Sequence, residues 1–145
     1  MQENTLQSTI NTQLTLWLAT TNNADWKELV ATHAPQLPHL LAARFDYDVR
    51  QGGFAQFLYN MNGHLLAQIE DMLIAANAHI AHDFYVQAIR LCLENKADYQ
   101  RFLASNYTDA NTLKDALHLL SIAYLGKKVD FQSEAHAFLA SGLPV

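Results

Sequence analysis

Three neighbouring side chains, His79, His82 and Asp83, are of types that bind transition metals. Residues three apart share one face of a helix, but a closed zinc site needs four ligands and a catalytic one at least three. The sequence contains neither an HEXXH nor a CXXC pattern that would complete such a set. We therefore interpret the two histidines as exposed or capping groups at a helix start, and we predict no metal and no other cofactor.

The single cysteine, Cys92, lies late in a strongly apolar segment and close to Glu94. A nucleophilic thiol needs a pKa lowered by a helix N-terminus or by a cationic neighbour, so a buried structural cysteine is the better interpretation. The GXSXG turn of hydrolases and the glycine-rich loops that bind phosphates are not found in the sequence either. We predict no catalytic residue, and hence a protein that is not an enzyme.

The carboxylates allow three interpretations. They could be paired acid–base groups, provided that burial separates their pKa values; they could form a solvated polar face; or they could form an acidic surface that imitates phosphates. The net charge is −5, and residues 1–85 hold eight acidic and three basic residues, whereas residues 86–145 hold six of each. This distribution offers no basic face for nucleic acid and favours a basic protein partner, such as a DNA-binding protein or a toxin. The predicted acidic patch comprises Asp46, Asp48, Glu70, Asp71 and Asp83.

The elements that must position these groups are predicted to be helices. Half of the 145 residues are hydrophobic, whereas glycine and proline number only five and three. We expect an all-α fold, a single compact domain (1–145) of about seven or eight short helices. Apolar residues at helical spacing place these helices at about 4–20, around Trp26, at 38–51, 54–61, 63–76 and 80–93, around Phe102, and at 113–124 and 135–139. The helix at 80–93 is apolar nearly all round, so we expect it to be central and buried.

Gly52 and Gly53 separate two of these helices. A helix often ends on a glycine in the left-handed conformation, where a side chain is penalised, so the pair predicts a helix–helix corner. Asn62 and Gly63 predict a second corner. An alternative function, an enzyme or small-ligand-binding protein, would place a pocket beside the first corner, with polar groups from Tyr47, Arg50, Gln56 and His64.

The segment around the double glycine resembles a known family. An acidic and aromatic lead-in is followed by Gly-Gly-Phe-x-Gln-aromatic and then by an asparagine. This pattern is similar to that of the DNA mimic protein 19-like family, small helical bacterial proteins of largely unassigned activity. The matching residues are Asp48, Val49, Gln51, Gly52, Gly53, Phe54, Gln56, Phe57 and Asn60.

The resemblance implies an all-α fold and, as in the family's namesake, a homodimer that covers the DNA-binding surface of a transcription factor with its carboxylates. A duplex mimic is usually strongly acidic, so at −5 we expect a localised acidic patch. The resulting hypothesis is a non-enzymatic inhibitor of a basic partner, acting on a transcription factor or as an immunity protein. The first residues lack a signal-peptide pattern and no apolar run reaches about 20 residues, so we expect a cytoplasmic protein without a membrane span.

Overall fold

The computed structural model describes residues 37–141, and the described part is all-α, without strands. Its helices are α3 (Leu37–Met61), α4 (Leu66–Ala75), α5 (His79–Glu94), α6 (Lys96–Ala104), α7 (Thr112–Leu125), α8 (Phe131–Glu134) and α9 (His136–Ser141). The predicted helices at 4–20 and around Trp26 lie outside the described residues. None of the described helices combines the length and the apolar character that a bilayer span requires.

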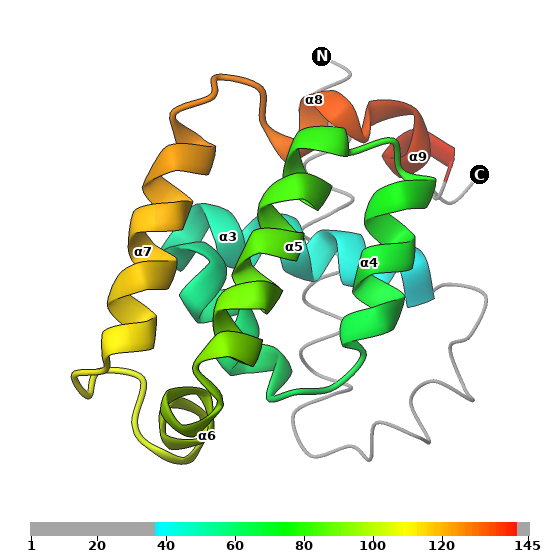
Figure 1. Ribbon diagram of the computed structural model, residues 1–145. Helices are drawn as coiled ribbons and strands as arrows, with labels where there is room; N and C mark the ends of the chain where they lie inside the picture. The colour runs from blue at the N-terminus through cyan, green and yellow to red at the C-terminus, as the bar shows by residue number, and fades with distance from the viewer. Residues whose placement is uncertain (1–36, 142–145) are drawn as a thin grey trace.

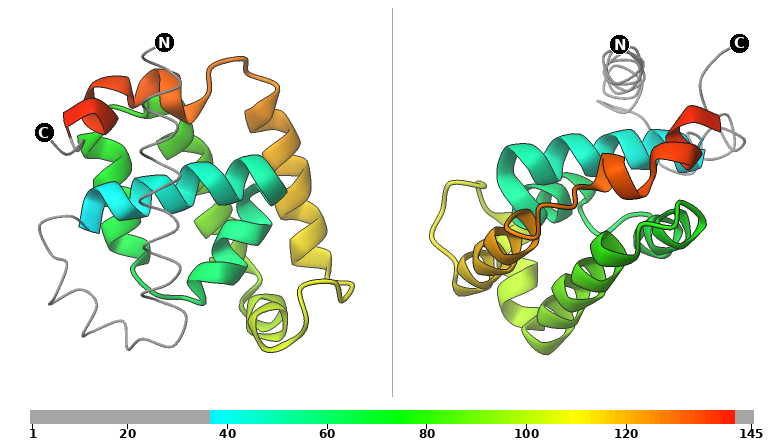
Figure 2. Two further views of the ribbon diagram at one scale, coloured as in Figure 1. Left: turned by 180° about the vertical axis from the view of Figure 1, so that it is seen from behind. Right: turned by 90° about the horizontal axis from the view of Figure 1, so that it is seen from above.

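The helices form two layers. α4, α5 and α7 lie side by side in one layer with α5 in the middle, and α3 crosses behind them, in contact with both α4 and α7 (Figure 1). Figure 2 shows that α8 and α9 run alongside α3 at one end, whereas α6 closes the other end. The outer side of the α4–α5–α7 layer therefore has no other described helix lying over it.

The double-glycine corner is confirmed. α3 contains one non-helical residue, Gly53, with φ 75° and ψ −169°, and the helix changes direction there. The second predicted corner is confirmed as well, because α3 ends at Met61 and is followed by Asn62 and Gly63 with φ of 51° and 79°. Because of these two corners, α3 lies across the layer of α4, α5 and α7, and the chain then turns back into that layer as α4.

Aromatic residues on either side of the corner fill the core. The ring of Phe45 lies 5.2 Å from those of both Phe57 and Phe131, and the ring of Phe54 lies 5.5 Å from that of Tyr124. These five side chains are buried, and they join α3 to α7 and α8. The aromatic residues around the corner are thus mainly core, as their helical spacing predicts.

One expectation about α5 is wrong. Its buried residues follow a single face, Ala81, Phe84, Tyr85, Ala88 and Cys92, whereas Leu93 is 61% exposed. α5 is central in its layer, but α3 covers only its inner side. The outward side carries apolar residues that no other described helix covers.

Candidate protein-binding surface

Two of the five predicted patch residues, Asp46 and Asp48, do not lie at the surface. Each is only 2% exposed and each is paired with an arginine one helical turn away. Arg50 Nη2 lies 2.6 Å from Asp46 Oδ2, and Arg44 Nε lies 2.9 Å from Asp48 Oδ2. The prediction that Asp46 and Asp48 belong to an acidic surface patch is therefore wrong, because both carboxylates are buried and each is paired with an arginine of α3.

The polar residues of the sequence motif complete this buried network. Asn60 Nδ2 and Gln56 Nε2 donate to the Asp48 carboxylate at 3.2 and 3.4 Å. From α8, Gln132 Nε2 donates to Asp46 Oδ2 at 2.9 Å. Burial nevertheless raises the pKa of both aspartates, against the opposing effect of their arginines. Asp48 thus ties together the two halves of α3, which gives the motif a structural role.

The corner itself is filled by protein atoms. A Cβ on Gly53 would lie 2.4 Å from Ser121 Oγ of α7, and the Phe54 amide donates to the same oxygen at 2.8 Å. This packing leaves no room for a ligand between Gly53 and α7. Of the four polar groups expected to line a pocket beside the corner, Arg50 and Gln56 instead bind aspartates within α3.

The other three predicted residues, Glu70, Asp71 and Asp83, lie on α4 and α5. The Glu70 side chain is 45% exposed, and its Oε2 lies 3.0 Å from His82 Nε2. Asp71 and Asp83 are exposed, and Asp83 accepts a hydrogen bond from Gln87, also on α5. Because Glu70 contacts His82, the residue next to Asp83, the middle of α4 and the first turn of α5 bring these acids into one region.

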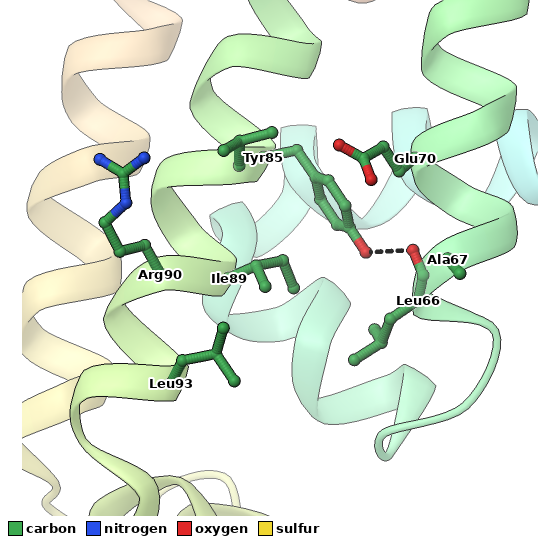
Figure 3. Close-up of a pocket in the computed structure, with 8 residues that line it drawn as sticks. Leu66, Ala67, Glu70, Tyr85, Ile89, Arg90 and Leu93 are labelled. Carbon is green, nitrogen blue, oxygen red and sulfur yellow. Dashed lines mark hydrogen bonds between the residues drawn. The ribbon is translucent and has the colours of Figure 1, made fainter.

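An apolar groove runs between α4 and α5 next to these acids (Figure 3). It encloses about 390 Å³. Tyr85 forms its floor, and the tyrosine hydroxyl donates to the Leu66 carbonyl at 2.8 Å. The remaining lining residues are Leu66, Ala67 and Glu70 from α4, and Val86, Ile89, Arg90 and Leu93 from α5.

A family model described as DMP19-like protein matches residues 32–141. The chain belongs to the DMP19-like protein family. No curated protein and no solved structure matches it. The resemblance inferred from the motif is therefore confirmed, and the matched range includes every described helix.

In this DMP19-like chain the groove is the feature that sequence reasoning missed. Val86, Ile89 and Leu93 repeat at the three- and four-residue spacing of one helical face, but the same face had been assigned to the core. Two further cavities lie between α5 and α7 and after α7. The outward side of α7 also exposes Leu119, Ile122 and Leu125 by 50% or more.

His82 and Cys92 of α5 occupy structural positions. His82 contacts Glu70, and within residues 37–141 no cluster of three or more metal-ligating side chains occurs. Cys92 is buried, and burial raises the pKa of its thiol to about 11. A thiol with such a pKa is almost fully protonated at neutral pH, so Cys92 is unsuited to nucleophilic chemistry.

Proposed function

We propose that the protein acts without catalysis, by binding a basic protein through the outward face of α4 and α5. The observation that carries this proposal is the combination of exposed carboxylates, Glu70, Asp71 and Asp83, with an apolar groove beside them. Charges at the rim of an interface increase the association rate, and desolvated apolar contacts supply most of the affinity. Membership of the DMP19-like family supports a protein partner.

The acidic region is local. Arg90 lies two helical turns after Asp83 on the same strip of α5, about 10 Å along the axis. A short basic segment therefore fits this region better than an extended imitation of duplex DNA. The partner would be a transcription factor or a nuclease toxin whose basic surface the protein blocks. A homodimer, which light scattering measures, is a further proposal suggested by the family resemblance.

The test is capture from extracts of cells that naturally produce the protein, at low salt, followed by elution with a salt gradient. We expect a basic protein to be retained by the wild type, released as salt rises, and largely lost with Asp71→Asn/Asp83→Asn. The matched control is Asp109→Asn/Asp115→Asn, which removes the same charge from exposed positions on other elements. Equal retention of the partner by both double variants would exclude the acidic α4–α5 face as its binding site.

A further inference from the structure

The groove between α4 and α5 offers few polar groups to a small molecule. Small-ligand sites usually combine an apolar lining with several convergent donors and acceptors. Here the Tyr85 hydroxyl donates to Leu66, and Glu70 is in contact with His82. The remaining lining of the groove, apart from Arg90, is aliphatic. Such a groove is better suited to the apolar side chains of a folded peptide segment, whose backbone holds them in place without polar contacts to the groove.

The spacing of the lining matches the spacing of a helix. Val86, Ile89 and Leu93 lie along one side of α5 over about two turns, and Leu66 stands on the facing wall. Two neighbouring helices with such a groove accept a third helix, whose apolar side chains at i, i+3 or i+4, and i+7 enter it. Leu93 is 61% exposed, so a helix placed there would bury it.

Opposite charges stand on the two walls. Figure 3 shows Glu70 of α4 beside the Tyr85 ring, and Arg90 at the outer edge of the groove, where its side chain projects across α5 towards α7. A helix lying between them would be matched in charge if it carried lysine or arginine on the side towards α4 and a carboxylate on the side towards α5. Charges placed in this way set the orientation of a bound helix.

We propose that the groove between α4 and α5 binds an amphipathic helix of the partner, with apolar anchors flanked by basic residues on one side and acidic residues on the other. This inference rests on the proposed function and names the part of the partner that is recognised. Asp71 lies one helical turn after Ala67, and Asp83 lies one turn before Val86, so helical spacing places both carboxylates beside the groove. Neither is among its lining residues. The two parts of the surface can therefore be altered separately.

The experiment selects binders for the full-length protein from a phage library of amphipathic helices displayed on a stable helical scaffold. We expect enriched clones to share apolar anchors at i, i+3 or i+4, and i+7, with Lys or Arg along one flank and Asp or Glu along the other. Leu93→Asp should weaken their binding at least about tenfold, because it places a charge against the anchors. Ile122→Asp, an equally exposed apolar position on α7, should leave binding within about twofold.

A charge exchange tests the orientation. Glu70→Lys should weaken the enriched clones, and changing their facing basic residue to glutamate should restore binding to this variant. The inference is overturned if no clone is enriched, if clones lack the two charged flanks, or if Leu93→Asp binds them as tightly as the wild type. None of these results alters the capture experiment with Asp71→Asn/Asp83→Asn, so the two proposals fail independently.

Discussion

Four charged residues of α3 form two ion pairs that overlap along the helix. Arg44 pairs with Asp48 and Asp46 pairs with Arg50, each at the i, i+4 spacing. Removing either member of a buried pair leaves an uncompensated charge, which is strongly destabilising. The arrangement therefore fixes these carboxylates inside the molecule, and their contribution is to the shape of the corner.

The raised pKa values of Asp46 and Asp48 predict a pH dependence of stability. A carboxyl whose pKa is higher in the folded than in the unfolded state favours folding fully below the unfolded value, about 3.9. That contribution is lost as pH rises through the folded pKa. We expect the free energy of unfolding to fall less between about pH 4 and neutrality in Asp48→Asn than in the wild type. Urea denaturation across this range is the measurement.

The control for this titration is Asp83→Asn, which changes an exposed carboxylate of α5. It leaves the network of Asp46 and Asp48 intact, so the loss of stability towards neutrality should be retained. If Asp48→Asn differs from the wild type by the same free energy at both ends of the range, burial has not shifted the titration of Asp48.

A methyl group added at Gly53 is predicted to be strongly destabilising. Its φ of 75° with ψ of −169° is a conformation that essentially only glycine adopts, and an added Cβ would overlap Ser121. We expect Gly53→Ala to lower the free energy of unfolding by about 3 kcal/mol or more, measured by urea denaturation. Gly63→Ala is the control: its φ is 79°, but the nearest atom, Tyr99 Oη, is 3.8 Å from the new Cβ. It should cost about 1–2 kcal/mol, and equal losses would show that the contact with Ser121 contributes nothing.

For single residues, the sequence predicts the backbone conformation of the corner better than it predicts which side chains are buried. The glycine pair predicts the corner because few other residues tolerate its φ. The sequence could also have shown that Asp46 and Asp48 are paired, because Arg50 and Arg44 are each four residues from one of them, the spacing at which charged side chains meet on a helix. What spacing could not show is that α8 would supply Gln132 to the Asp46 carboxylate, because that contact depends on tertiary packing.

At the level of elements, the first turn of α5 is stabilised by a side chain from another helix. The residue before α5 is Ala78, which has no polar side chain to cap the helix. Instead Glu134 of α8 accepts hydrogen bonds from the amides of Ile80 and Ala81 at 2.8 and 3.1 Å. A carboxylate at this position satisfies free amides and interacts favourably with the helix dipole.

We therefore expect Glu134→Ala to lower the free energy of unfolding by about 1–2 kcal/mol. Amide hydrogen exchange at Ile80 and Ala81 should accelerate, because both donors lose their acceptor. Ser133→Ala, one residue away on the same short helix, should change neither quantity appreciably. Unchanged protection of the two amides in Glu134→Ala would mean that the carboxylate does not stabilise this helix start.

Helix positions were largely predictable, whereas the environment of each helix was not. The 3.6-residue repeat and the residues Asn62, Gly63 and Gly126 locate α4 and α7 to within a few residues. The same repeat assigned Ile89 and Leu93 to the core, because an apolar groove and a core face have the same sequence pattern. The cap from Glu134 was also missed, since 54 residues separate it from Ile80.

For the molecule as a whole, composition and the glycine motif were enough to predict the all-α class and the family, both of which are confirmed. The distribution of charge over the surface was not predictable from totals. The first 85 residues carry the excess of acid, but Asp46 and Asp48 are balanced by arginines within the fold. Among the acids of that half that the structure describes, only Glu70, Asp71 and Asp83 reach the surface, and the proposed contact with a basic partner uses these three.

Because the carboxylates Asp71 and Asp83 are separate from the apolar groove, we expect them to affect the association rate and the groove to affect the dissociation rate. Long-range attraction acts before contact and is screened by salt, whereas desolvated contacts act after it. With a helix selected on the groove, Asp71→Asn/Asp83→Asn should lower the association rate at low salt and have no effect at high salt. Leu93→Ala should raise the dissociation rate about equally at both salt concentrations. Surface plasmon resonance at two ionic strengths measures both rates. The prediction fails if Leu93→Ala changes the association rate, or if the double variant changes the dissociation rate. Either result would mean that the carboxylates and the groove form one continuous contact surface.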